Sequence, residues 1–374
     1  MHFLFFNMVD SRRYYIPKML YCQVSDGRQL GGSKGIFKTI KGENGEVIDC
    51  VDIYKQPSFA HPLMLDHIIQ LEPSFNTSKL RLKDVIVKES WQNYGECPRG
   101  SVPILRKQGT YPSFYANNKL APLDDPSFQY QLAAVKHEKK GGMYGAHAKV
   151  NIWRPSVNQF DASLSKISIL AGDGDDLKTI EVGWRVAPAT GSSDPTTFIY
   201  WSDNKNKSAG CYNLDCPGFI KTGQTLAIGA KLDHISAYDG VQYDVDYEIR
   251  MDENTKNWWV TVNGSPQGYW PSKLFSGTFQ NGDVVQWGGE AKIKVDTQYT
   301  TPTQMGSGHM ADEGLKKACY MTDIKYINED GKQIALTADG LDPLDGGHFR
   351  YKVSIDATID ERPFVYFGGP GGPL

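Results

Sequence analysis

Two short segments of the chain carry glutamates in settings that suit acid–base chemistry. One is Ile180–Val186 (IEVGWRV), which contains Glu181, and the other is Val285–Ala291 (VQWGGEA), which contains Glu290. If both segments are β-strands, side chains alternate between two faces, so each glutamate shares its face with a glycine two positions away. A glycine inside a strand leaves room for a second backbone to approach. The two segments therefore predict a flat floor on which a peptide could lie, with a carboxyl group in each strand.

Two carboxyl groups that lie close together can hydrolyse an amide bond. One stays ionised and takes a proton from water, while the other stays protonated and donates to the carbonyl oxygen or the leaving nitrogen. Repulsion between like charges separates the two titrations, which favours an acidic working pH. The pattern does not say which glutamate is the acid. It also fits two ordinary surface glutamates on solvated strand faces, so both interpretations stay open at this point.

Further motifs follow one another in a fixed order around these segments. They are Phe198–Ser202 (FIYWS), Gly210–Phe219 (GCYNLDCPGF), Asn257–Trp259 (NWW), Gly268–Pro271 (GYWP), Thr303–His309 (TQMGSGH) and Phe367–Gly371 (FGGPG). With the two glutamate segments, they resemble the ordered signature of the neprosin domain. Upstream, Asp49–Pro62 (DCVDIYKQPSFAHP) resembles the activation peptide that precedes this domain in plant precursors. The resemblance covers nearly the whole chain from Ile36 onward.

The resemblance implies a plant-type glutamic endopeptidase that cleaves after proline and is made as a zymogen activated at acid pH. The catalytic glutamates of the family carry over onto Glu181 and Glu290, and neither a metal nor another cofactor is implied. The expected partners are polypeptide substrates, including proline-rich ones, and the chain's own prosegment as an intramolecular inhibitor. The family also implies a secreted or vacuolar protein, although the N-terminal residues do not read as a signal peptide.

Aromatic side chains near the glutamates suggest how a substrate would be held, because an aromatic wall suits a proline ring. The residues that we expect to line the groove are Tyr200, Trp201, Gln304, Trp184 and Trp287. Strand alternation nevertheless places Trp184 and Trp287 on the face opposite the glutamates, and aromatic residues of strands are more often part of the core. A core position is therefore the competing expectation for these two side chains.

The chain has six cysteines, and four of them suggest disulfides. Cys211 and Cys216 enclose four residues, which favours a small disulfide loop over a zinc site, because no second Cys or His pair stands at ligand spacing. A disulfide between Cys50 and Cys97 would staple a small N-terminal module, although sequence alone does not prove the pairing. Members of the family usually have a further cysteine near the C-terminus. This chain lacks it, so we expect Cys319 to be a free buried thiol.

The elements that must position these residues read as strands. With 12% aromatic residues, 38 glycines and 20 prolines, the composition suits short strands joined by tight turns. Residues 241–251 alternate strictly between apolar and polar side chains, which predicts a half-buried antiparallel strand. Many such segments without helices between them predict an all-β fold, a β-sandwich of two antiparallel sheets preceded by a small prosegment module.

Four parts of the chain are expected in order. Residues 1–35 are a leader to which no structure is assigned, and residues 36–106 form the activation peptide. Residues 107–128 are rich in turn-forming residues and lack a sustained period, which predicts an exposed linker open to proteolysis. Residues 129–374 form the catalytic sandwich.

Some functions are excluded by composition, and two rivals remain. The net charge of −3 and the scattered lysines and arginines leave no basic surface for nucleic acid. No run is long and apolar enough to cross a bilayer, so no membrane partner is expected. A glycoside hydrolase could use the same two carboxyl groups. A catalytically silent cell-wall or carbohydrate-binding sandwich could keep the fold without activity.

Overall fold

Strands dominate the computed structural model of the chain. It describes residues 35–77, 88–107, 127–206, 208–277, 279–295, 302–345, 349–358 and 362–372. Within these residues every helix is a 3₁₀ turn of three to five residues, and no helix is long and apolar enough to cross a membrane. The predicted leader lies outside the described residues apart from Gly35, as does most of the predicted linker.

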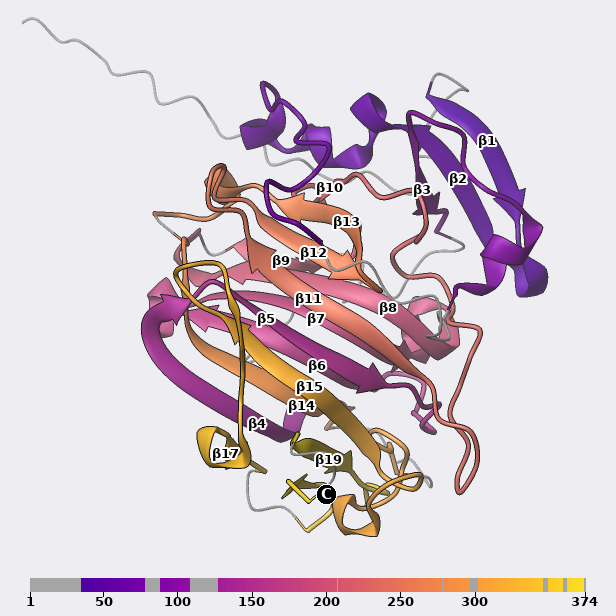
Figure 1. Cartoon of the computed structure of the whole chain (residues 1–374). Coiled ribbons are helices and arrows are strands. Elements are labelled where there is room, and N and C mark those ends of the chain that lie inside the picture. The colour runs from indigo at the N-terminus through magenta and orange to yellow at the C-terminus, as the bar shows by residue number, and fades with distance from the viewer. Residues whose placement is uncertain are drawn as a thin grey trace, which may run out of the picture. The chain divides into compact units, whose positions relative to one another are not determined.

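Two antiparallel sheets form the sandwich, which confirms the predicted fold class (Figure 1). The seven-stranded sheet has the order β17 (Asp342–Leu344), β4 (Phe128–Met143), β14 (Gly282–Lys294), β6 (Ala162–Ala171), β7 (Lys178–Ala187), β8 (Ser192–Asp203) and β9 (Ser208–Tyr212). The nine-stranded sheet has the order β10 (Ile220–Lys221), β13 (Ser265–Trp270), β12 (Trp258–Val262), β11 (Asp244–Met251), β5 (Gly145–Asn151), β15 (Cys319–Ile327), β19 (Phe364–Gly368) and β18 (Lys352–Asp356), with β16 (Gln333–Ala335) paired to β15.

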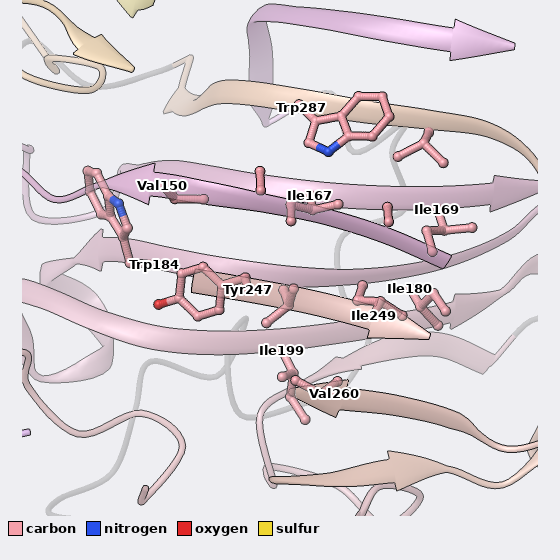
Figure 2. Close-up of a cluster of buried hydrophobic side chains, with 14 of the residues drawn as sticks. Val150, Ile167, Ile169, Ile180, Trp184, Ile199, Tyr247, Ile249, Val260 and Trp287 are labelled. Carbon is pink, nitrogen blue, oxygen red and sulfur yellow. The ribbon is translucent and has the colours of Figure 1, made fainter. Parts of the chain in front are cut away.

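The core lies between the two sheets and follows the alternation of each strand. Figure 2 shows Ile180 and Trp184 of β7 in one cluster with Trp287 of β14 and with Tyr247 and Ile249 of β11. All five side chains are fully buried. Burial of each large apolar side chain contributes roughly 1.5–3 kcal/mol, so this layer fixes which face of β7 and β14 points outward. The residues between the core positions, including both glutamates, are thereby held on the opposite face.

The small N-terminal module is a three-stranded sheet of β1 (Ile36–Lys41), β2 (Val47–Asp52) and β3 (Ser101–Leu105). A disulfide joins Cys50 to Cys97, as predicted. Trp91 lies in a small apolar cluster with residues of β1 and β2 and is almost fully buried. A compact module of this size needs such a staple because its own core is small.

The module is held to the sandwich by hydrogen bonds at the β10–β13 end of the nine-stranded sheet. Gln56 accepts a bond from the backbone nitrogen of Lys221 at 2.7 Å and donates one to the carbonyl oxygen of the same residue at 3.0 Å. The carboxylate of Asp252 accepts bonds from the side chain of Gln70 at 2.8 Å and from the backbone nitrogen of Ser74 at 2.6 Å. Polar docking of this kind can be loosened by a change in protonation.

Candidate active site

Three neighbouring strands of the seven-stranded sheet carry the predicted site on their outward face. The central strand is β6, which pairs with β14 on one side and with β7 on the other. Glu290 of β14 stands opposite Leu164, and Glu181 of β7 stands opposite Ser168. The two glutamates are therefore two strands apart and offset by four residues along β6. Their backbone positions are diagonal to each other across the floor.

A lysine between them brings the two carboxyl groups together. Lys166 lies midway along β6, and its Nζ is 2.7 Å from Glu181 Oε1 and 2.7 Å from Glu290 Oε2. Because both oxygens touch one nitrogen, the two carboxyl groups are within direct electrostatic reach of each other. The structure thus brings the carboxyl groups of Glu181 and Glu290 together, although the two residues are 109 positions apart in the sequence.

Sequence reasoning did not identify Lys166 as a functional residue. In the segment around it (SLSKISIL), a lysine on the polar face of a strand has the usual appearance of a solvated side chain. In the structure it is only 8% exposed. The sequence held only an indirect signal for it. The glycines that share a face with the glutamates, Gly288 and Gly183, are the register partners of Lys166 on β14 and β7.

These two glycines explain why the floor is flat beside Lys166. A Cβ added at Gly183 would overlap the backbone of Ser165 on β6, and one added at Gly288 would overlap the backbone of Ala134 on β4. Gly288 also has φ +151°, a conformation that other residues rarely adopt. With no side chains at these positions, the lysine and both glutamates have room to converge over the strands.

The surroundings of Glu181 favour its protonated form. The side chain is buried, and burial raises the pKa of its carboxyl group. The positive charge of Lys166 lowers that pKa and the negative charge of Glu290 raises it, with a net upward shift. Ser168 Oγ donates a hydrogen bond to Glu181 Oε1 at 3.0 Å, so both bonds from described residues fall on Oε1. Oε2 is therefore the oxygen that can carry the proton.

Lys166 keeps its charge in this setting. Burial alone would lower the pKa of the ammonium group, but attraction to Glu181 and Glu290 outweighs that cost and raises the pKa. The site therefore contains a lasting positive charge between two acids. A buried charge is tolerated only where partners compensate it, and here each carboxyl group supplies one contact.

Of the five residues predicted to line a groove, Tyr200 lies beside the glutamates. It is the register partner of Glu181 on β8, so it shares the outward face, and its ring packs against Tyr212 at 4.8 Å between centroids. Burial raises the pKa of its hydroxyl group, which keeps the tyrosine neutral. Tyr200 and Tyr212 together form an apolar wall next to Glu181.

The three tryptophans occupy the core, which corrects the expectation that they line the groove. Trp184 and Trp287 are fully buried and donate their indole N–H groups to the backbone oxygens of Asn151 and His147. Both appear in Figure 2 among the inward-facing side chains. Trp201 is 6% exposed and packs edge-on against Phe275. The physical reason is strand alternation, because all three side chains point away from the face that carries the glutamates.

In the part of the chain that the structure describes, Gln304 is hydrogen-bonded to the backbone of Ser156 and not to the glutamates. Its side-chain oxygen accepts a hydrogen bond from the backbone nitrogen of Ser156 at 2.8 Å, and its own backbone nitrogen donates to the oxygen of Ser156 at 2.8 Å. No contact among the described residues links it to Glu181 or Glu290. Its predicted role in substrate binding stays a prediction.

The cysteines pair as predicted. Cys211 and Cys216 form a disulfide, and Cys319 is a free, fully buried thiol whose pKa is raised by burial. Within the described part of the chain, no three His, Cys, Asp or Glu side chains are grouped so that they could hold a metal ion. A hollow of about 390 Å³ lined by residues such as Phe75 and Arg250 lies against β11 in the other sheet, apart from the glutamates.

The fold and the site together define a class: an all-β sandwich whose outward face bears a Glu–Lys–Glu cluster in which Glu181 and Lys166 are buried and Glu290 is partly exposed. The chain belongs to the neprosin family, since the family model Neprosin matches residues 159–370, more than half of its length. The model Neprosin activation peptide matches residues 39–110 directly before that domain. Family membership supports a peptidase with an N-terminal prosegment.

Comparison with solved structures finds distant likenesses. Scytalido-glutamic peptidase with a transition state analog inhibitor shares 10% identity at a TM-score of 0.36, covering 65% of this chain and 98% of that one. SCP-B, a member of the Eqolisin family of peptidases, shares 8% identity at 0.33, with 65% and 98% covered. Galectin LEC-6 of Caenorhabditis elegans shares 9% identity at 0.24, with 45% and 94% covered. At these identities and TM-scores, the activities of those proteins cannot be inferred for this chain.

Proposed function

We propose that this protein is a glutamic endopeptidase whose acid–base pair is Glu181 and Glu290. The observation that carries the proposal is the meeting of both carboxyl groups at a single nitrogen, each at 2.7 Å from Lys166 Nζ. Two acids held this close share their titration, so one can be protonated while the other is ionised. That is the state that hydrolysis of an amide bond requires.

We assign the two roles from the surroundings of each carboxyl group. Glu181 is the acid, because burial raises its pKa and its Oε2 is left to carry the proton. Glu290 is the base and takes a proton from water, whose oxygen attacks the carbonyl carbon of the substrate. The carbon–nitrogen bond then breaks, and Glu181 gives its proton to the leaving nitrogen. Transfer of the proton from Glu290 to Glu181 returns the pair to its starting state.

The substrate would be a polypeptide cleaved after proline. The apolar wall of Tyr200 and Tyr212 beside Glu181 supports this choice, since a proline ring packs well on aromatic faces. The match of residues 39–110 to an activation peptide supports synthesis as a zymogen in which the prosegment acts as an inhibitor. Export from the cell, to the outside or to a vacuole, belongs to the same proposal.

Two isosteric variants test the assignment. In Glu181→Gln and Glu290→Gln the side chains keep their shape but cannot exchange a proton, so kcat on a proline-containing peptide at acid pH should fall about 10²–10⁴-fold in each. Glu329→Gln, an exposed position outside the site, is the matched control and should keep full activity. A cell-wall glycan is assayed in parallel. Cleavage of the glycan instead of the peptide, or peptide cleavage that both variants retain, would rule the proposal out.

A further inference from the structure

Lys166 is the one member of the cluster to which the proposed reaction assigns no role. We propose that it is a positioning residue of the site, which holds the two carboxyl groups together and sets the acidic pH range in which they work. This inference rests on the proposed peptidase function. It adds a third functional residue and a specific origin for the pH optimum.

The register of the strands shows why a third residue is needed. Glu181 and Glu290 extend from strands that are not neighbours, and their register partners on β6 are four residues apart. At about 3.3 Å per residue, this offset along the strands is roughly 13 Å. The two glutamate side chains would not bring their carboxyl groups together across that distance without a common partner. Lys166 stands halfway between those partners, and its ammonium group is the point at which both carboxyl groups end.

The other charged groups on this face are engaged elsewhere. From β7, Arg185 lies over the ring of Tyr212 at 4.5 Å. From β14, Lys292 lies over the ring of Phe128 at 4.1 Å, and from β4, Lys136 pairs with Glu138. From β8 and β9, Tyr200 and Tyr212 interact electrostatically with both glutamates, whereas Asp194 of β8 pairs with Arg154 and Lys231. Burial raises the pKa of both tyrosines, so they stay neutral. Among the described residues, Lys166 is therefore the cation in hydrogen-bonding contact with the glutamates.

The structural cost of this arrangement argues for a role in function. Burying an ion pair rarely stabilises a fold more than well-packed apolar residues of the same volume would. Here a lysine that is 8% exposed is inserted between two acids, on a floor cleared by two glycines. This arrangement contributes little to stability, but it brings two proton-exchanging groups together. A catalytic role for the cluster explains it.

The charge has a predictable effect on the working pH. A cation within about 4 Å favours the ionised form of a carboxyl group and lowers its pKa by about 1–3 units. With Lys166 present, the base is ionised and the acid gives up its proton at lower pH than they otherwise would. Without the charge of Lys166, no cation offsets the repulsion between the two carboxyl groups. Both limbs of the pH–rate profile must therefore move to higher pH.

Three substitutions separate charge from shape. Lys166→Arg keeps the charge, Lys166→Gln keeps a hydrogen-bond donor without it, and Lys166→Met keeps the length alone. The profile of kcat/KM against pH should stay in place for the arginine variant and move up by about 1–3 units for the other two. The methionine variant should also lose the most activity at its own optimum. Lys178→Gln, equally buried at the start of β7 and bonded to a backbone oxygen, is the control and should leave the profile unchanged.

Two results would overturn the proposal. One is a glutamine variant whose profile stays at the wild-type pH. The other is a glutamine variant with higher kcat at an unmoved optimum, because the lysine would then be blocking the pair. Unfolding midpoints measured at the pH of each assay show whether each variant is folded.

A titration that needs no activity keeps this inference separate from the proposed function. The side-chain carboxyl carbons of ¹³C-labelled glutamate are followed by NMR in wild type and in Lys166→Gln, with Glu181→Gln and Glu290→Gln for assignment. The pKa of Glu181 should rise when the lysine is removed, because the charge of Lys166 lowers it in wild type. If wild type cleaves no peptide, the proposed function fails while this titration still decides on Lys166. If the pKa of Glu181 does not move, the inference about Lys166 fails whatever the activity.

Discussion

Individual carboxyl groups in this molecule are buried in two quite different settings. Glu181 has a cation beside it, whereas Glu89 in the N-terminal module is 1% exposed and bonded to neutral donors. Burial raises the pKa of Glu89 to about 8, against the lowering effect of hydrogen bonds from Trp91 and from the backbone nitrogen of Ala227. Glu89 is therefore neutral in the folded protein at pH 7, and it joins the module to the sandwich in that form.

A pH-dependent stability follows from this raised pKa. Between the unfolded value near 4.5 and the folded value of about 8, the folded chain holds a proton at Glu89 that the unfolded chain has released. Stability from this group is therefore present at low pH and is lost as pH rises through that window. Glu89→Gln has no proton to lose, so from pH 5 to pH 7 it should gain roughly 2–3 kcal/mol relative to wild type. Urea unfolding at the two pH values measures the difference.

The exposed Glu72→Gln in the same module serves as the control for that experiment. It should follow the wild-type dependence, because its side chain is exposed and the substitution leaves Glu89 in place. Parallel curves for wild type and Glu89→Gln would show that the carboxyl group is ionised in the folded module, contrary to the expectation.

The candidate site was only partly predictable from the sequence. Glu181 and Glu290 were identified by their motifs, and alternation indicated that each faces outward with a glycine. Lys166 was missed because its contacts depend on the register of β6 with two other strands, which no local pattern specifies. Trp184, Trp201 and Trp287 were assigned to a groove on chemical grounds, although the strand parity of Trp184 and Trp287 already indicated the core.

At the scale of elements, strands with a clear alternation were predicted well. Residues 241–251 were predicted as a half-buried strand, and the buried face of β11 holds Val245, Tyr247, Ile249 and Met251. Val241 is 62% exposed, because β11 begins only at Asp244. The 16-residue β4 was not predicted as a strand. Its second half contains a run of charged residues and two glycines, which hides the apolar period of the first half.

The contact between the module and β11 predicts how acid loosens the precursor. Burial opposes ionisation of Asp252, but hydrogen bonds from Ser74 and Gln70 outweigh it and lower the pKa of this carboxyl group. A lowered pKa contributes docking stability above the unfolded value of 3.8, and that contribution is lost as pH falls through the folded value. Protonation of Asp252 therefore removes an acceptor from two donors of the module.

Asp252→Asn should imitate this acid effect at neutral pH. The amide nitrogen would face two donors, so the module should be held less tightly by about 1.5–3 kcal/mol. Limited proteolysis at pH 7 should then cut residues 35–107 faster than in wild type, with the sandwich left intact. Asp175→Asn, in an exposed turn of the sandwich, is the matched control. Equal rates of cutting in all three proteins would mean that these bonds do not hold the module.

At the scale of the whole molecule, docking and catalysis occupy different places. The described contacts of the module include residues of β10 and β13, Asp252 directly after β11, and the segment around Ala227, while the glutamates lie on the outward face of β7 and β14. Among the described residues, no contact joins the module to Glu181, Lys166 or Glu290. In the proposed function, release of the module and catalysis by the glutamate pair are therefore expected to respond to acid separately.

The two responses can be separated by mass spectrometry of the full chain before and after acidification. Wild type should lose its N-terminal segment only when pH falls far enough to protonate Asp252, because loss of that carboxylate weakens docking, whereas the raised pKa of Glu89 strengthens docking as pH falls from about 8 to about 5. The inactive Glu181→Gln should keep the segment when alone but lose it when a trace of wild type is added, since its module is loosened in the same way. Asp252→Asn should be processed at a higher pH than wild type. If Glu181→Gln lost its segment unaided and at the wild-type rate, maturation would depend on another protease, and the pair would have no part in it.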